Sequence, residues 1–161
     1  MNTKQKVIAI DGPSASGKGT VASRVAQALG FDYLDSGALY RLTALYAKKR
    51  DVEWSDEEAV AELAENLPAR FEGSQVFLDD EDVSRQIRSE AIGMGASAVA
   101  QLPKVRAALL QRQRDFLTEK GLVADGRDMG SVVFPDAALK IFLTAGAKIR
   151  AERRAKQIGI P

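Results

Sequence analysis

The chain has 161 residues, with 23 Lys and Arg against 22 Asp and Glu for a net charge of +1, and it contains neither cysteine nor histidine. The balanced charge gives no indication of a nucleic-acid-binding arm or an acidic tail, and the missing cysteine excludes disulfides and thiolate metal sites. The missing histidine excludes hydrolases with a histidine base, histidine-ligated zinc enzymes and protein kinases with a His-Arg-Asp loop. The chemistry that remains uses lysine, arginine, aspartate and a metal, which suits phosphoryl transfer.

At this length the chain can form one main core that buries roughly 70% of the surface of its unfolded state. Residues 1–6 are polar, and the apolar run after them is too short for a signal sequence or a membrane span. We therefore expect a soluble, cytoplasmic protein that binds neither a membrane nor a nucleic acid. We also expect a monomer.

A glycine-rich segment, residues 12–20, follows the apolar run 7–10 and Asp11 without a gap. The apolar run suits a strand that is buried on both faces. The apolar residues after the segment recur at helical spacing: Val21, Val25, Ala28 and Leu29. The segment therefore joins a strand to a helix, where backbone N–H groups, the positive end of the helix and Lys18 all attract an anion. This pattern predicts a loop that binds the phosphates of a nucleoside triphosphate.

The residues of this predicted phosphate-binding loop are Gly12, Pro13, Ser14, Ala15, Ser16, Gly17, Lys18, Gly19 and Thr20. The usual pattern has Ser or Thr directly after the lysine, whereas here Gly19 lies between Lys18 and Thr20, an order typical of nucleoside monophosphate kinases. Two alternatives stay open: a dinucleotide-binding pattern over residues 17–22 with Asp35 downstream, and a turn that binds nothing. The dinucleotide pattern begins well past the predicted strand, however, and it leaves Lys18 without a role.

The next predicted strand covers residues 31–34, and residues 35–37 form a strand-to-helix turn. A helix follows to about Arg50, with Arg41 in its first turn. An arginine at this position is often only solvated. In an open α/β fold, however, it would lie beside the carboxyl ends of the parallel strands, where ligands bind.

The middle of the chain predicts a short helix followed by a hairpin. Ser55 and Glu58 fit a capping box with Ser55 as the N-cap, and Pro68 ends the helix. Residues 70–72 and 75–78 flank a Gly-Ser turn and predict two antiparallel strands. The acidic residues 79–82 behind them are either a solvated turn or a metal site.

Two further helices are predicted before the next strand. Residues 85–101 have a helical pattern that is rich in alanine and glycine, which indicates close packing or mobility. Pro103 suits the first turn of the second helix, and Val105 and Leu109 lie on its apolar face. The pattern alone assigns no role to Arg106.

Residues 122–126 and 139–143 predict two more apolar strands. Asp125 ends the first of them, where it could hold Mg²⁺ directly or through water. Arg127 and Asp128 come next, and the forked guanidinium of Arg127 suits phosphate, although neighbouring charges in a loop are often only exposed. The basic run 147–157 predicts a helix that is either solvated or a lid over phosphates.

Four segments, in this order, resemble the bacterial cytidylate kinase family: IDGPSASGKGT at 10–20, LDSGALYR at 34–41, VRAALL at 105–110 and ADGRDMG at 124–130. The resemblance runs from the first strand to Pro161. It implies an α/β fold, a P-loop NTPase-like parallel sheet flanked by helices, with an inserted monophosphate-binding subdomain and a lid. The P-loop core would comprise residues 1–67 and 101–161, with the lid beginning near residue 147. The monophosphate-binding insert would comprise residues 68–100.

The resemblance also implies transfer of the γ-phosphoryl group of ATP to CMP or dCMP with Mg²⁺ as the cofactor. The phosphate-binding loop would hold the ATP phosphates, and Lys18 would bridge toward the transferred group. The implied metal ligands are Thr20 and Asp125. The implied catalytic residues are Lys18, Arg41 and Arg127.

The same comparison by position implies an acceptor site. Arg41 and Arg127 would bind the phosphate of CMP, with Ser36 nearby. The cytosine edge would be bound by Ser97, Arg106 and Asp128.

Members of the family continue beyond Pro161 through the rest of the lid, a fifth strand and a last helix. We therefore expect this sequence to be a fragment or to lack a tail, and the strand at residues 139–143 to have an open apolar edge. Two alternatives stay open: a P-loop kinase for another nucleoside monophosphate, and a truncated form that binds nucleotide without turnover. The guanine-binding Asn-Lys-x-Asp motif of GTPases is absent, because neither Asn2 nor Asn66 precedes a lysine.

Overall fold

The computed structural model describes residues 5–13, 17–73 and 75–144. The chain divides into two compact units. The first, which we call the sheet unit, comprises Met1–Tyr33 and Leu117–Pro161, and the second, the helical unit, comprises Leu34–Phe116. The predicted acceptor insert, residues 68–100, falls within the helical unit, and its borders stay a prediction.

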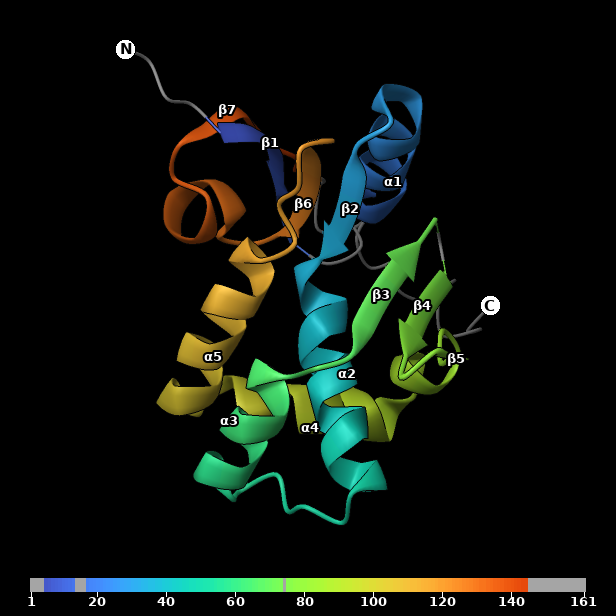
Figure 1. Cartoon of the computed structure of the whole chain (residues 1–161), viewed down its shortest axis with the longest axis vertical. Helices are drawn as coiled ribbons and strands as arrows, with labels where there is room; N and C mark the ends of the chain where they lie inside the picture. The colour runs from blue at the N-terminus through green and yellow to red at the C-terminus, as the bar shows by residue number, and fades with distance from the viewer. Residues whose placement is uncertain (1–4, 14–16, 74, 145–161) are drawn as a thin grey trace. The chain divides into compact units, whose positions relative to one another are not determined.

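A four-stranded sheet with the order β2-β6-β1-β7 forms the centre of the sheet unit (Figure 1). Its strands are β1 (Gln5–Asp11), β2 (Asp32–Asp35), β6 (Leu122–Gly126) and β7 (Ala137–Phe142). β1 pairs in parallel with β6 on one side and with β7 on the other. All four strands lie where apolar runs predict them, which confirms the α/β class.

One helix of the sheet unit, α1 (Lys18–Leu29), packs against the sheet through small side chains. Its buried residues are Ala22 and Ala26, which form a core with Ile10 and Val123. The helix predicted from the spacing of Val21, Val25, Ala28 and Leu29 is confirmed, although Val21 is 41% and Leu29 52% exposed, so these larger residues do not form its buried face. The alanines let the helix lie close to the sheet, and close contact leaves no room for larger side chains between them.

The edge of the described sheet is formed by β7, which pairs with β1 alone. Leu139 and Phe142 on this strand are 50% and 67% exposed, so the described edge is apolar, as predicted. Between β6 and β7 the chain makes a π-helical turn, η2 (Met129–Val133). The predicted basic helix at residues 147–157 lies outside the described residues.

The helical unit is built around α2 (Ser36–Lys49), which contacts α3 (Glu57–Glu65), α4 (Glu90–Ala100) and α5 (Pro103–Arg114). Fully or nearly buried apolar side chains fill the space between these helices: Leu39, Leu42, Leu45, Val60, Ile92, Val99, Val105 and Leu109. The indole of Trp54 donates a hydrogen bond to the carbonyl oxygen of Ala44 (3.0 Å). Its ring lies against Gly95, where a Cβ atom would come within 2.4 Å of it, so only glycine fits.

The hairpin is confirmed, with β3 (Ala69–Glu72) antiparallel to β4 (Gln75–Leu78). A third strand, β5 (Glu81–Asp82), pairs with β4 and was not predicted. Asp79 and Asp80 link these two strands with left-handed φ angles of 53° and 64°. The acidic run therefore contributes a turn and a short strand, and the described residues contain no acidic cluster suited to a metal ion.

Two predicted helix starts are wrong, because local side chains cap the backbone elsewhere. The N-cap of α3 is Asp56, whose carboxylate accepts a hydrogen bond from Ala59 N (3.3 Å), and not Ser55. The single helix predicted over residues 85–101 is divided into η1 (Gln86–Arg88) and α4. Ser89 separates them, since its backbone is extended and its hydroxyl accepts from Ile92 N (3.2 Å).

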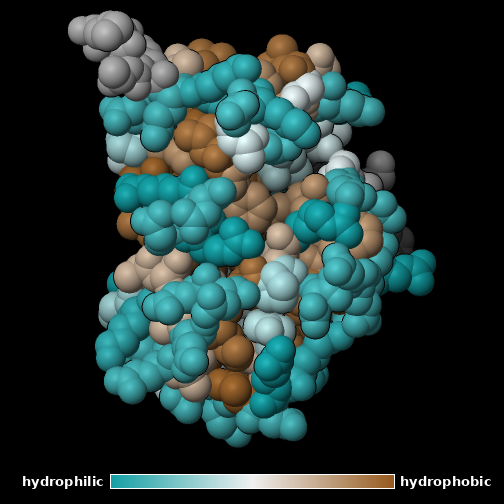
Figure 2. Space-filling model, viewed as in Figure 1, coloured by the Kyte–Doolittle hydropathy of each residue, from teal (hydrophilic) through white to brown (hydrophobic). Residues whose placement is uncertain are grey.

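Most of the surface in the view of Figure 2 is hydrophilic, and hydrophobic residues show in separate areas. In the part of the chain that the structure describes, no helix combines the length and the apolar character needed to cross a membrane.

Candidate functional site

The predicted phosphate-binding loop begins where β1 ends. Gly12 is buried, and its N–H donates to the carbonyl oxygen of Gly126 (3.1 Å), which joins the start of the loop to the end of β6. Pro13 is partly buried, and Ser14, Ala15 and Ser16 lie outside the described residues. Gly17 closes the loop with a left-handed φ of 88°, a conformation that favours glycine.

Gly17 is also the N-cap of α1, and no side chain of the described residues caps this end of the helix. The first turn of α1 contains no acidic residue. The N–H groups of a first turn have no partner inside their own helix, and the helix dipole makes this end positive. A phosphate group therefore suits this position better than any group that the described chain supplies.

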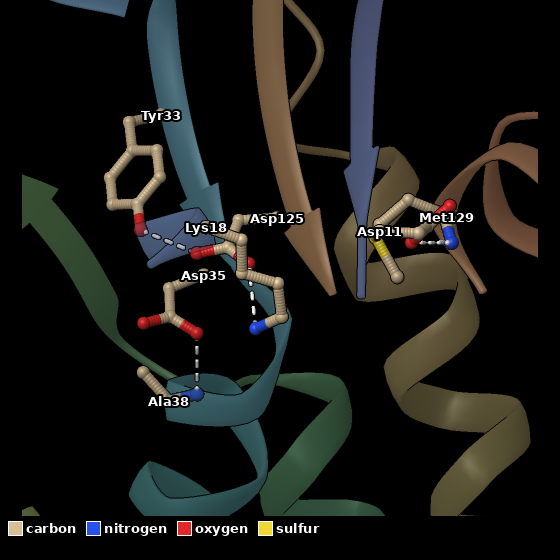
Figure 3. A network of polar contacts seen from close by, with 7 residues as sticks. All are labelled: Asp11, Lys18, Tyr33, Asp35, Ala38, Asp125 and Met129. Atoms are coloured by element: carbon tan, nitrogen blue, oxygen red, sulfur yellow. Dashed lines mark hydrogen bonds and ion pairs between the residues drawn. The ribbon is translucent and has the colours of Figure 1, made fainter. Parts of the chain in front are cut away.

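Lys18 and Asp125 form an ion pair at this end of the sheet (Figure 3). The Nζ atom of Lys18 lies 3.0 Å from Oδ1 of Asp125, and the two side chains are 18% and 2% exposed. Strand register explains the position of Asp125, because it pairs with Ile10 one residue before β1 ends. Two residues that are far apart in sequence are thus brought together by the neighbouring strands, as predicted.

The second oxygen of Asp125 accepts a hydrogen bond from the hydroxyl of Tyr33 on β2 (3.0 Å). Gly19 brings the first turn of α1 close to the same carboxylate, since a Cβ atom there would lie 3.5 Å from Oδ2. Thr20 follows on an exposed part of this turn. Sequence analysis assigned no role to Tyr33, and a tyrosine in a short strand carries no signal that distinguishes a functional hydroxyl from a core ring.

The residues present at this point suit a magnesium ion. Oδ1 of Asp125 is buried and accepts no hydrogen bond from the described residues, with the ammonium of Lys18 as its charged neighbour. Carboxylate and hydroxyl oxygens are ligands that Mg²⁺ accepts. Asp125 and Thr20 thus fit the chemistry of the predicted metal site.

Asp11, the last residue of β1, holds the segment that follows β6. Its buried carboxylate accepts hydrogen bonds from Met129 N (2.8 Å) and Gly130 N (2.9 Å). Arg127 and Asp128 precede these amides directly and are exposed. The sequence analysis did not predict that Asp11 holds this segment. A carboxylate at the end of a buried apolar strand needs hydrogen-bond donors, and this need could have indicated such a role.

The carboxyl of Asp128 is harder to ionise than an ordinary aspartate. Although its surface is exposed, nearby protein atoms keep part of the surrounding water away from this carboxyl, which raises its pKa, and the negative charge of Asp11 raises the pKa further. The protonated and ionised forms of this carboxyl therefore differ less in free energy near neutral pH than is usual for an exposed aspartate.

Ser36 and Arg41, both predicted acceptor residues, lie on α2 in the helical unit. Asp35 is the N-cap of α2, since its carboxylate accepts from Ala38 N (3.0 Å), and this cap makes the buried Ser36 the first helical residue. The prediction that Arg41 lies in the first turn of the helix is therefore wrong. Because α2 begins at Ser36, Arg41 lies in its second turn.

The guanidinium of Arg41 is held by two features of the helical unit. Its Nη1 atom donates to the carbonyl oxygen of Ile87 (2.7 Å). It also faces Gly93 on α4, where a Cβ atom would lie 3.2 Å from Nη2 and 3.3 Å from Nη1. The absent side chain of Gly93 thus provides the space in which this guanidinium lies.

Ser97 on α4 and Arg106 on α5 are both exposed. Their predicted contacts to cytosine stay predictions. The predicted acceptor residues are divided between the units, with Arg127 and Asp128 in the sheet unit and the others in the helical unit.

Known proteins are similar to this chain over most of its length. A family model described as cytidylate kinase matches residues 8–160. Cytidylate kinase from Neisseria meningitidis serogroup C is 81% identical over 158 residues, which cover 98% of this chain and 72% of the relative. Cytidylate kinases from Neisseria gonorrhoeae and Chromobacterium violaceum are 80% and 64% identical, with 98% and 94% of this chain covered and 72% and 68% of the relatives. The crystal structure of TT1252 from Thermus thermophilus matches with a TM-score of 0.46 and 22% identity, over 99% of this chain and 75% of that one.

Proposed function

Because the chain belongs to the cytidylate kinase family, we propose that it transfers the γ-phosphoryl group of ATP to CMP, giving CDP and ADP, and to dCMP, giving dCDP. It is accordingly a phosphotransferase with a phosphate group as the acceptor. Such a reaction places little demand on covalent chemistry, so the protein acts mainly by positioning and charge stabilisation. The absence of histidine from the whole sequence is compatible with this mechanism.

The donor side of the proposal rests on the sheet unit. The phosphate-binding loop and the uncapped start of α1 would hold the ATP phosphates, with Lys18 directed at the group that is transferred. Mg²⁺ would be held by Thr20 and Asp125, and when bound it neutralises charge on the β- and γ-phosphates. The donor side is supported by the Lys18–Asp125 ion pair, which joins the start of α1 to the end of β6, because a metal-bound triphosphate requires both a cation and an anion near it.

The acceptor side of the proposal takes residues from both units. Arg41 and Arg127 would bind the phosphate of CMP, where a planar guanidinium can make two parallel hydrogen bonds to phosphate oxygens. Ser36 would lie nearby. Support comes from the anchored guanidinium of Arg41 and from the ordered segment behind Arg127, which Asp11 holds by two amides.

Base choice would depend on Ser97, Arg106 and Asp128, which can offer both donors and acceptors to the cytosine edge. We expect Arg106→Ala and Asp128→Ala to lower the ratio of CMP to UMP turnover. An unaltered ratio in both variants would contradict this assignment while leaving the kinase activity itself in place.

A panel of nucleoside monophosphates with ATP and Mg²⁺, measured by coupled ADP release, tests the proposed reaction. We expect CMP and dCMP to be phosphorylated fastest. Faster turnover of AMP, UMP or dTMP would assign the chain to another acceptor. ATP binding without turnover of any acceptor would indicate a nucleotide-binding form that is inactive.

We also propose that the protein is cytoplasmic and acts as a monomer on small nucleotides. Light scattering of the purified chain at working concentration tests the second point. A mass of twice that of one chain would overturn it.

A further inference from the structure

A tyrosine hydroxyl completes the surroundings of the carboxylate that faces Lys18 (Figure 3). Tyr33 on β2 donates to Oδ2 of Asp125 at 3.0 Å, while Lys18 lies 3.0 Å from Oδ1. We infer that Tyr33 is a positioning residue for Asp125, which holds Oδ2 so that Oδ1 faces Lys18 and the donor nucleotide. This inference rests on the proposed function, in which Asp125 contributes to the metal site.

The two oxygens of Asp125 are therefore not equivalent. A carboxylate without a fixed partner can turn about its last bond and exchange its oxygens. The Tyr33 hydroxyl removes this freedom by engaging one oxygen, and the 2% exposure of the side chain leaves little water to replace it. Hydrogen bonds to a charged group are among the stronger ones in proteins, so the orientation is held firmly.

The two partners of Asp125 differ in what they do when ATP arrives. In the proposed function Lys18 turns toward the phosphates, which weakens its pairing with Oδ1. The Tyr33 hydroxyl has no such second role in the proposal and keeps its hold on Oδ2. Tyr33 would thus keep the carboxylate in place during the exchange of Lys18 for a metal-bound phosphate.

The ring of Tyr33 makes apolar contacts that are separate from the hydrogen bond of its hydroxyl. The partly buried ring packs against the core cluster that includes Ile10 and Val123. The variant Tyr33→Phe keeps this apolar contact and removes the hydroxyl alone. A change in function without a large change in stability is therefore attributable to the hydrogen bond.

The experiment compares Tyr33→Phe with Tyr46→Phe in the same chain. Tyr46 serves as the matched control because its hydroxyl accepts an exposed hydrogen bond from Arg50 within the helical unit (2.7 Å). Two readouts are used: the Mg²⁺ concentration that gives half-maximal turnover at saturating ATP and CMP, and Mn²⁺ binding to the ATP-loaded protein without CMP, measured by electron paramagnetic resonance. The second readout does not depend on turnover.

We expect Tyr33→Phe to raise the half-saturating metal concentration and to weaken Mn²⁺ binding by about tenfold, the loss typical of one hydrogen bond to a charged group. The KM of Tyr33→Phe for CMP should stay within twofold of that of the unmodified chain. In Tyr46→Phe, the half-saturating metal concentration and Mn²⁺ binding should also stay within twofold. A metal requirement within twofold of the unmodified chain would overturn the inference. A KM for CMP that rises as much as the metal requirement would also overturn it, because a general disturbance of the fold explains that result.

Asp125→Asn separates this inference from the proposed metal role. If Asp125→Asn leaves the metal requirement unchanged, the proposed role of Asp125 fails, and the inference fails with it. If Asp125→Asn raises the metal requirement and Tyr33→Phe does not, only the positioning role of Tyr33 is wrong.

Discussion

The two units of this chain hold their charged residues in different ways. In the sheet unit, Asp125 and Asp11 lie at the ends of buried strands, and each carboxylate is engaged on both of its oxygens by a side chain or by backbone amides. In the helical unit, the guanidinium of Arg41 donates to the carbonyl oxygen of Ile87 and lies in the space that Gly93 leaves open.

This difference predicts two kinds of sensitivity. Parallel strands bring residues together by register, so the sheet unit should respond mainly to changes of charge and hydrogen bonding. Packed helices position side chains by volume, so the helical unit should respond mainly to added or removed atoms.

The largest effect is expected for Lys18→Ala in the sheet unit. In the proposed function Lys18 faces the transferred group, so the substitution removes that cation and also breaks the ion pair with the buried Asp125; we expect turnover to fall about 10³- to 10⁴-fold. A coupled kinase assay measures turnover, and thermal unfolding measures the effect of the lost ion pair on stability. Lys49→Ala is the control, because it breaks an ion pair with Glu81 that is exposed on both sides (3.1 Å) and should leave turnover unchanged. Turnover of Lys18→Ala within tenfold of the unmodified chain would contradict the donor assignment.

Arg127→Ala tests the other functional segment of the sheet unit. We expect turnover to fall about 10²- to 10³-fold, because the acceptor phosphate loses a charged partner. The melting temperature should change little, since Arg127 is exposed and Asp11 holds the following segment through the amides of Met129 and Gly130. Unchanged turnover would remove Arg127 from the site.

Gly95→Ala and Gly93→Ala compare volume at two positions of α4. At Gly95 the new methyl group would come within 2.4 Å of the rigid ring of Trp54, so we expect a loss of about 1–3 kcal/mol in the free energy of unfolding. Trp54 is the only tryptophan in the sequence, and its fluorescence reports this change during urea unfolding.

At Gly93 the new methyl group would meet the end of a flexible arginine at 3.2 Å, so stability should change less. Displacing the guanidinium of Arg41 should instead raise the KM for CMP roughly tenfold and leave the KM for ATP unchanged. In this interpretation Gly95 makes room for the Trp54 ring and Gly93 makes room for the Arg41 guanidinium. If both substitutions change stability and the KM for CMP to the same extent, this distinction is wrong.

The smallest expected effect concerns pH and Asp128. Because desolvation by nearby protein atoms and the charge of Asp11 raise the pKa of Asp128, the folded state holds its proton more tightly than the unfolded state. Stability from this group is therefore full at acidic pH and is lost as the pH rises through the raised pKa. Asp128→Asn should stabilise the chain at neutral pH, and the gain should shrink as the pH falls toward the ordinary carboxyl range. Urea unfolding at several pH values measures this trend, and a gain that stays constant with pH would exclude the electrostatic cause.

Much of the fold was predictable because it depends on local patterns. The apolar runs at β1, β6 and β7 indicated strands, and the Gly-Ser turn indicated the hairpin of β3 and β4. Helix starts were less predictable, as Asp56 and Ser89 show, because several neighbouring residues can cap a helix and only the folded backbone selects one.

For the proposed site, the sequence alone determined which residues are candidates for the chemistry. The glycine loop with Lys18 is a local pattern that favours phosphate binding, and the acid at the end of an apolar strand is a local pattern that favours a metal ion. Their partners were decided by the tertiary structure alone. Tyr33 meets Asp125, Asp11 meets the amides of Met129 and Gly130, and Gly93 makes room for Arg41 only because strand order and helix packing bring distant residues together. Contacts of this kind depend on the register and spacing of whole elements, which no single stretch of sequence contains.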